Sequence, residues 1–235
     1  MTHRLAMSWT GAALSFAAVL LARQAMAHGI GGADAAFVAS STGPQIVPFL
    51  YLGAKHMVTG YDHLLFILGV IFFLYRLSHV ALYVTMFSLG HSITLLTGVL
   101  TGVKADSHLI DAIIGLSVAY KAFDNLGGFR TLFGVQPNAK AAVLIFGLFH
   151  GFGLATKLQA LKPSKDGLIV NMISFNVGVE IGQLIALSVM LGLILWWRRS
   201  PRFARTAIAA NALILLCGFL LMDDQIVGFI TRKGA

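Results

Sequence analysis

The chain has 235 residues, of which 57% are hydrophobic and only 11% are charged, and its mean hydropathy is +0.83. This composition is too apolar for a soluble domain of this size and is typical of a protein whose solvent is lipid. The net charge of +8 does not indicate a nucleic-acid partner, because many basic residues stand at the ends of apolar segments. Topology signals and lipid headgroup contacts are expected there. The single cysteine, Cys217, excludes an intrachain disulfide.

The first 27 residues resemble a secretory signal peptide. Arg4 provides the positive start, an apolar core follows, and an A-x-A cleavage motif ends at Ala27. Cleavage makes His28 the mature N-terminus, where an amine and an imidazole lie close enough to bind one metal ion. The alternative is an uncleaved first membrane span. Residues 28–47, rich in Gly, Ala and Ser, are expected to form a flexible or lightly structured periplasmic segment.

The apolar segments in the rest of the chain predict an all-α integral membrane protein, a bundle of about six transmembrane helices. The transmembrane domain covers residues 48–229 and a short tail covers 230–235. A glycine-rich loop is expected at 124–138. The six expected spans are 48–75, 79–101, 108–123, 140–160, 167–197 and 204–229.

The distribution of basic residues predicts the orientation. Six spans after a periplasmic N-terminus place both chain ends outside the cytoplasm. Lys and Arg are then moderately more abundant in the inner connections, as the positive-inside rule requires. The clearest inner anchor is the WWRRSPR stretch that begins at Trp196. This pattern indicates a multi-pass protein of the bacterial inner membrane.

The densest polar group lies in the stretch 55–68, at His56, Asp62 and His63. In one continuous helix the two histidines are seven residues apart and share a face, and Gly60 between them leaves room beside the imidazoles. Two imidazoles and a carboxylate in lipid are costly unless they pair, bind something or line water. The alternative interpretation is a set of satisfied polar residues that hold helices together.

Two further spans each carry a histidine. His91 shares a helix face with Ser88, and His150 lies among glycines. Gly147 and Gly151 form a small-xxx-small pair that lets another backbone approach closely. Either histidine alone is also explained as a polar link between helices.

Acidic and amide groups follow in two other spans. Asn176, Glu180 and Gln183 recur at i, i+4 and i+7, which places them on one polar face of an apolar helix. By this reasoning Glu180 is the deepest acidic residue, and an intramembrane glutamate marks an ion or proton path. The alternative is a protonated glutamate held by its two amide neighbours. Asp111 is either a supporting group or an interfacial charge.

Together, histidines and carboxylates from several spans form a plausible metal-ligand set. Imidazole with carboxylate or amide oxygen suits a borderline divalent cation such as nickel, cobalt or zinc, and the absence of further cysteines argues against a thiolate site. We expect the ligands to be His56, Asp62, His63, His91, His150 and Glu180. The supporting residues are Gly60, Asp111, Asn176, Gln183 and His28.

These motifs resemble the HupE/UreJ family of bacterial membrane proteins, and in particular its second branch. The H-x-x-x-G-x-D-H signature is present at His56, Gly60, Asp62 and His63, and similar patterns surround His91, His150, and Asn176 with Glu180. The resemblance covers about residues 48–229 and implies a nickel or cobalt permease associated with hydrogenase or urease systems. Two positions depart from the pattern. Met57 follows His56 where hydrogenase-linked members usually have proline, and Gly90 precedes His91 where alanine is expected.

The favoured function is therefore a secondary permease for a divalent transition metal, not an enzyme. The chain lacks a P-loop, so accumulation requires a gradient or a partner. A second hypothesis is a metallochaperone of a metalloenzyme maturation system, in which His28 matters more. A third is a membrane-embedded zinc enzyme, although H-E-x-x-H and G-x-S-x-G motifs are absent.

Overall fold

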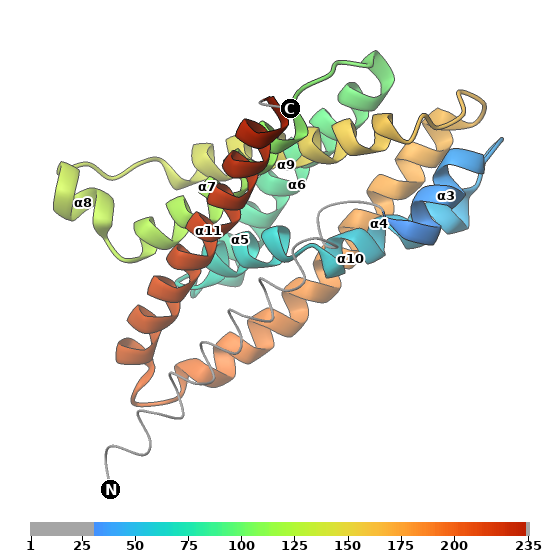
Figure 1. The fold of residues 1–235 in the computed structure, drawn as a ribbon. Coiled ribbons are helices and arrows are strands. Elements are labelled where there is room, and N and C mark those ends of the chain that lie inside the picture. The colour runs from blue at the N-terminus through green and yellow to red at the C-terminus, as the bar shows by residue number, and fades with distance from the viewer. Residues whose placement is uncertain (1–30, 234–235) are drawn as a thin grey trace, which may run out of the picture.

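The computed structural model describes residues 31–233 (Figure 1). The signal peptide and His28 lie outside this part of the chain. The described residues fold into helices without strands: α3 (Gly32–Ser40), α4 (Ile46–Thr59), α5 (Tyr61–Ile71), α6 (Leu77–Thr101), α7 (Ser107–Asn125), α8 (Gly128–Phe133), α9 (Ala139–Ala160), α10 (Leu168–Arg198) and α11 (Phe203–Lys233).

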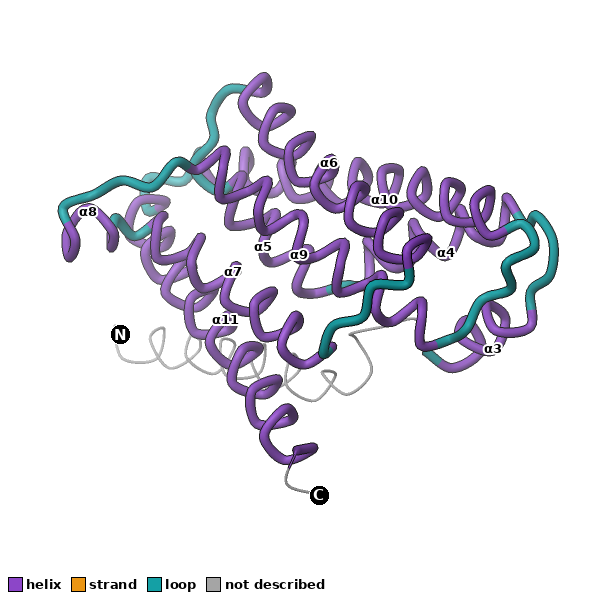
Figure 2. The backbone as a smooth tube through the Cα atoms, turned by 90° about the horizontal axis from the view of Figure 1, so that it is seen from above, coloured by secondary structure: helices purple, strands orange, loops and turns teal. Residues whose placement is uncertain are grey.

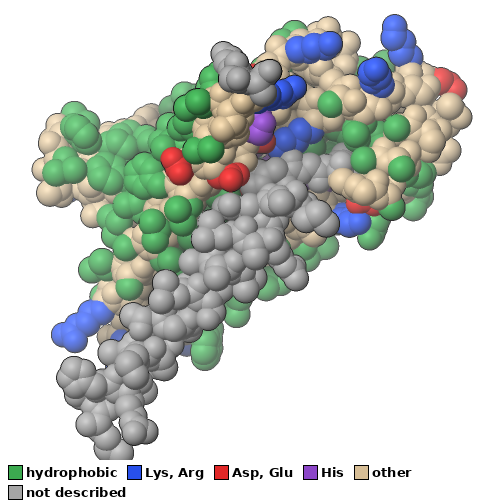
Figure 3. Space-filling model, viewed as in Figure 1, with side chains coloured by type: hydrophobic (Ala, Val, Ile, Leu, Met, Phe, Trp, Pro, Cys, Tyr) green, Lys and Arg blue, Asp and Glu red, His purple; other side chains and the backbone are tan. Residues whose placement is uncertain are grey.

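Four of the described helices, α6, α9, α10 and α11, are long and apolar enough to cross a membrane. Large aliphatic side chains on their surfaces remain uncovered. Leu184, Val189 and Leu193 on α10 are each about 60% exposed, which water would disfavour and lipid accepts. Figure 3 shows hydrophobic side chains over much of the visible surface. The chain is therefore an all-helical membrane protein.

The helices associate in three close pairs, α4 with α10, α6 with α9, and α7 with α11. Glycines explain the closeness. A Cβ added to Gly151 on α9 would collide with the backbone of His91, and one added to Gly178 on α10 would collide with that of Leu50. Small residues permit this approach in lipid, where packing rather than the hydrophobic effect holds helices together. The small-xxx-small prediction for Gly147 and Gly151 is confirmed, because Gly147 similarly meets Phe87.

The first expected span is not one continuous helix. The chain is helical from Ile46 to Thr59 and again from Tyr61 to Ile71, and Gly60 between them is extended (φ −75°, ψ 100°). The expectation that His56 and His63 share a face of a single helix is therefore wrong. Their rings still meet across the break, with centroids 5.1 Å apart.

Both ends of this broken segment are tied to α10. At one end the Gln45 amide donates to Asn171 Oδ1 over 2.6 Å, and Asn171 Nδ2 donates to the Gly43 carbonyl over 3.0 Å. At the other end the Arg198 guanidinium donates to the carbonyls of Ile71, Phe72 and Leu74, which cap α5. The broken segment thus runs in the same direction as α10, with α4 packed closely against it and α5 in contact with it at few positions.

Two regions expected to be loops contain helix. The segment before the first span includes α3, which an ion pair of 2.7 Å between Asp34 and Lys55 fastens to α4. The loop expected at 124–138 begins later than predicted, because α7 continues to Asn125, and it contains the short α8. Figure 2 shows the connecting loops gathered toward opposite ends of the helical body.

Candidate metal-binding site

Four imidazoles from four helices form a cluster with His63 at its centre. The ring centroid of His63 lies 5.1 Å from that of His56, 5.7 Å from that of His91 and 4.9 Å from that of His150. His63 starts α5, His56 ends α4, and the other two lie in the middle of α6 and α9. The structure thus brings together all four histidines that the sequence assigned to the site.

The break at Gly60 produces the centre of this cluster. A Cβ on Gly60 would lie 3.0 Å from His63 Nδ1 and 3.2 Å from Asp62 Oδ1. Both contacts are tighter than a side chain normally accepts, so glycine lets the turn close over the imidazole. Gly60 therefore supports the cluster by letting the side chains of Asp62 and His63 come close to the backbone.

Hydrogen bonds fix the orientation of two rings. His63 Nδ1 lies 2.9 Å from Asp62 Oδ1, and His150 Nδ1 lies 2.8 Å from the Phe146 carbonyl oxygen. A carboxylate or a carbonyl oxygen accepts, so Nδ1 carries the proton in both neutral imidazoles. The other nitrogen, Nε2, then presents a lone pair. Metal-binding histidines are oriented by such partners.

The lone-pair nitrogens are buried without protein partners. Nε2 of His63, Nε2 of His150 and both ring nitrogens of His91 make no hydrogen bond within residues 31–233. These three side chains are at most 3% exposed. Buried polar atoms are rarely left unsatisfied, because the loss of hydration is costly. A cluster of such atoms on adjacent rings is therefore a candidate binding site.

A cavity of about 10 Å³ lies beside the cluster, enough for roughly one water-sized occupant. The lining residues are His56, Asp62, His63, Ile114, His150, Gly153, Leu154 and Lys157. The polar residues supply imidazole, carboxylate and the ammonium of Lys157, and the others supply apolar wall. The size and donor set suit a single ion better than an organic molecule.

The cluster is not a finished coordination sphere. Within the described residues no group of three or more His, Cys, Asp or Glu is arranged so that it could hold a metal ion. Two imidazoles on one tetrahedral ion have ring centroids about 5 Å apart, given metal–nitrogen bonds of about 2.0–2.1 Å. The separations of His63 from His150, 4.9 Å, and from His56, 5.1 Å, both match this value. In the first pair each Nδ1 also has an oxygen acceptor, which makes His63 and His150 the candidate core pair.

The polar face of α10 makes a separate set of contacts. Asn176 Nδ2 donates to Ser92 Oγ over 2.8 Å, and the Ser88 hydroxyl donates to Glu180. Gln183 lies 3.4 Å from Ser88 Oγ. The predicted stripe therefore faces α6, but its members are not among the cavity lining.

Glu180 is not the acid that the protein buries most. Glu180 is half-buried, whereas Asp62 and Asp111 are only 6% and 5% exposed. The neutral glutamate held by Asn176 and Gln183 is not found either, since the hydroxyl of Ser88 is its hydrogen-bond partner.

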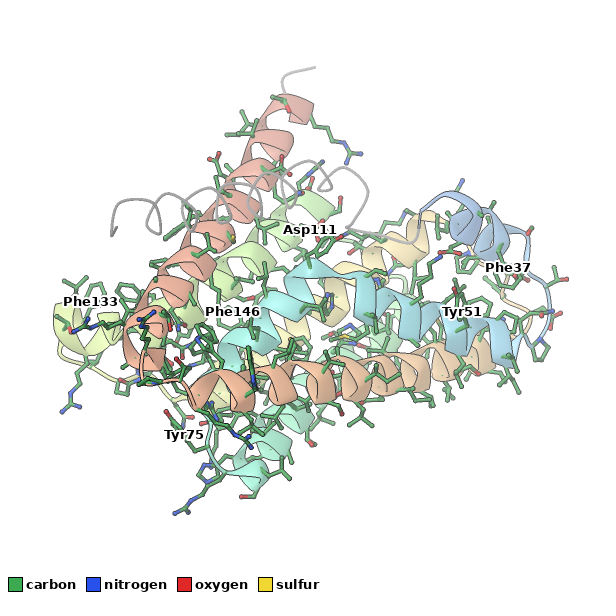
Figure 4. All side chains as sticks on the ribbon, turned by 90° about the horizontal axis from the view of Figure 1, so that it is seen from below. Phe37, Tyr51, Tyr75, Asp111, Phe133 and Phe146 are labelled. Carbon is green, nitrogen blue, oxygen red and sulfur yellow. The ribbon has the colours of Figure 1, made fainter. Side chains whose placement is uncertain are left out.

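Asp111 is buried and paired. It lies on α7 (Figure 4) and forms an ion pair with Lys157 of α9, with Nζ 2.9 Å from Oδ1 and 2.8 Å from Oδ2. Lys157 lines the cavity beside the imidazoles. Sequence reasoning gave this lysine no role in the site, because it stands near the end of an expected span. Its position one turn after Gly153, on the face of His150, is the signal that was available.

A family model described as "HupE / UreJ protein" matches residues 32–233, nearly all of the described chain. The chain belongs to the HupE/UreJ family. This family is generally linked to nickel and cobalt transport. No curated protein and no solved structure matches significantly.

Packing accounts for one departure of this HupE/UreJ protein from the family pattern. A Cβ on Gly90 would lie 2.6 Å from the Leu144 carbonyl oxygen on α9, so α6 and α9 approach here more closely than alanine permits. The other departure, Met57, is fully buried against Gly182 on α10.

Proposed function

We propose that this protein is a secondary permease that carries a divalent transition metal ion, nickel or cobalt, across the bacterial inner membrane. The cargo binds transiently at His63 and His150, with His56, His91 and Asp62 completing or supporting the site. The protein performs no chemical conversion. The proposal includes six spans after a cleaved signal peptide. In it α4 and α5 together form one span, which is broken at Gly60, and the continuous helix α7 forms another.

The observation that carries the proposal is the pair of oriented Nε2 lone pairs. Asp62 and the Phe146 carbonyl hold the protons of the two rings on Nδ1, and Nε2 of both rings is buried without a hydrogen bond in the described chain. Imidazole nitrogen is a preferred ligand of nickel, cobalt and zinc. Family membership favours the first two.

The incomplete coordination sphere supports transport over storage. An ion that must leave again needs a site strong enough to admit it and weak enough to release it. Two preoriented imidazoles meet that need better than a closed site of four ligands. A broken helix at mid-membrane is also a recurring site of ion binding in secondary transporters.

The test is uptake of Ni²⁺ and Co²⁺ into liposomes that contain only the purified protein. We expect gradient-driven uptake by the native chain and its near loss in His63→Ala and His150→Ala. The matched control is His79→Ala, because His79 is exposed at the start of α6. Metal analysis of the same preparations should show bound metal in the native chain and in the control only.

The outcomes separate transport from delivery. Metal bound with no uptake would contradict the permease and favour the metallochaperone, in which His28 provides a further ligand. Normal binding by the His63→Ala, His150→Ala double variant would contradict the site itself.

A further inference from the structure

A second cavity, of about 620 Å³, opens beyond the imidazole cluster. It is formed by the turn between α6 and α7 and the ends of α9 and α11. Its charged lining is mostly basic: Lys104, Asp106, Lys157, Lys162 and Arg232. Figure 3 shows Lys and Arg side chains grouped toward this end of the molecule. We call this cavity the vestibule.

Lys157 is the residue that the two cavities share. It lines the vestibule and also the 10 Å³ cavity beside His63 and His150. Its side chain is 21% exposed, whereas its partner Asp111 is 5% exposed. The ammonium group therefore stands between the wide basic space and the buried imidazoles.

Asp111 holds this ammonium with both carboxylate oxygens, at 2.9 and 2.8 Å. Gly153 keeps the space beside the carboxylate open, since a Cβ there would lie 3.6 Å from Asp111 Oδ1 and 3.0 Å from Ile114. A carboxylate oxygen is itself a ligand for a divalent cation. The flexible lysine stem can withdraw toward the vestibule once the carboxylate takes another cation.

We infer that the Lys157–Asp111 ion pair is a tethered-cation gate on the route from the vestibule to the imidazole cluster. The positive charge of Lys157 closes the route to a metal cation, and the entering ion displaces the ammonium from Asp111. Asp111 is then the first protein oxygen that the ion meets before the imidazoles. The inference rests on the proposed function and adds to it the group that controls access.

The gate is tested by the rate at which the full-length protein in detergent binds Co²⁺. Stopped-flow absorbance follows the visible bands of nitrogen-bound Co²⁺. Lys157→Met removes the charge and retains most of the bulk, and should raise the association rate about tenfold or more, within the range of electrostatic effects on encounter. Asp111→Asn leaves the lysine without its carboxylate and should slow association.

Two further variants keep the test decisive. Lys162→Met removes a charge that lines the vestibule but not the inner cavity, and should change the rate less than twofold. The double variant Asp111→Asn, Lys157→Met leaves no unpaired buried charge, so it should fold even if Lys157→Met does not. It should bind faster than the native chain but more slowly than Lys157→Met.

The outcomes distinguish the gate from the metal site. Unchanged Co²⁺ band positions with faster binding support the gate, because the coordinating imidazoles are intact. Native rates in the double variant, or equal acceleration by Lys162→Met, overturn the gate while leaving the proposed function standing. If no variant and no native sample binds Co²⁺, the proposed function is overturned and this inference with it.

Discussion

A single hydrogen bond decides which nitrogen of His63 is available to a metal ion. Because Asp62 accepts from Nδ1 at 2.9 Å, the proton is kept away from Nε2 and the ring is held in place. Asp62 thus positions the ring, whereas the sequence analysis expected it to be a metal ligand. The sequence showed that the two residues are neighbours, but it did not show which ring nitrogen of His63 is hydrogen-bonded.

Removing that partner should weaken metal binding without abolishing it. We expect Asp62→Ala to lower the affinity for Ni²⁺ or Co²⁺ about 10–100-fold, the usual effect of losing a group that orients a histidine ligand. Asp62→Asn should have a smaller effect, because its amide oxygen still accepts from Nδ1. Equilibrium titration of the purified protein measures both. Asp34→Ala, which breaks only the surface pair with Lys55, is the control.

Replacing Glu180 should reduce transport without changing metal binding. It lies outside the cavity lining and is bonded to Ser88 on α6, so Glu180→Gln should leave equilibrium affinity within about threefold. Uptake into liposomes should nevertheless fall strongly, because a half-buried carboxylate in the membrane is typical of an ion path. A variant that transports normally would restrict the role of Glu180 to holding α10 against α6.

The histidines could be predicted from residue type, because imidazole is uncommon in lipid and its function is recognisable. The basic partner of Asp111, Lys157, could not be predicted in this way. Lys157 looked like one of several lysines near a span end, and only the packing of α7 on α9 places it against Asp111. A residue's charge is visible in a sequence, whereas the partner that gives the charge a role comes from a distant segment.

At the level of elements, most helix boundaries followed from the apolar segments. The expected span 140–160 compares with Ala139–Ala160, and 167–197 with Leu168–Arg198. The break at Gly60 was not predictable from periodicity, because glycine inside a helical pattern is tolerated as often as it interrupts one. The polar tie from Arg198 to the end of α5 requires knowledge of which helices are neighbours.

Close glycine contacts make a testable distinction between two helix positions. A side chain at Gly151 would collide with the α6 backbone at His91, whereas Gly192 on α10 has no atom within 4 Å of an added Cβ. Overpacking of this kind costs about 3 kcal/mol or more when backbone must move. Gly151→Leu should therefore lower thermal stability in detergent and abolish metal binding, and Gly192→Leu should change neither. Equal tolerance would contradict the close α6–α9 pair.

For the whole molecule, the helix pairs have a consistent direction. Gln45 meets Asn171, and Arg198 meets Phe72, so α4–α5 and α10 are parallel. His108 bonds Gln225 near the start of α7, and Asn125 bonds Asn211 near its end, so α7 and α11 are antiparallel. Alternating crossings of six spans give these same directions. The sequence suggested the number of crossings, but the pairing of helices came only with the fold.

The alternation predicts which ends face the same side of the membrane. Lys104, Lys162 and Arg232 all line the vestibule, and the turn between α10 and α11 lies at the other end of α10. If the vestibule faces the periplasm, as the distribution of basic residues predicts, Lys162 is accessible from outside and Arg202 from inside. Both side chains are exposed.

Single-cysteine labelling measures this arrangement. The only native cysteine, Cys217, is buried, and Cys217→Ala removes any residual background. In intact spheroplasts, a membrane-impermeant maleimide should label Lys162→Cys and Arg232→Cys in that background. It should label Arg202→Cys only after permeabilisation, because charged reagents do not cross the hydrocarbon core. The reverse pattern would invert the orientation and place the vestibule in the cytoplasm. Labelling of Lys162→Cys and Arg202→Cys from the same side would contradict α10 as a complete crossing, and with it the six-span arrangement.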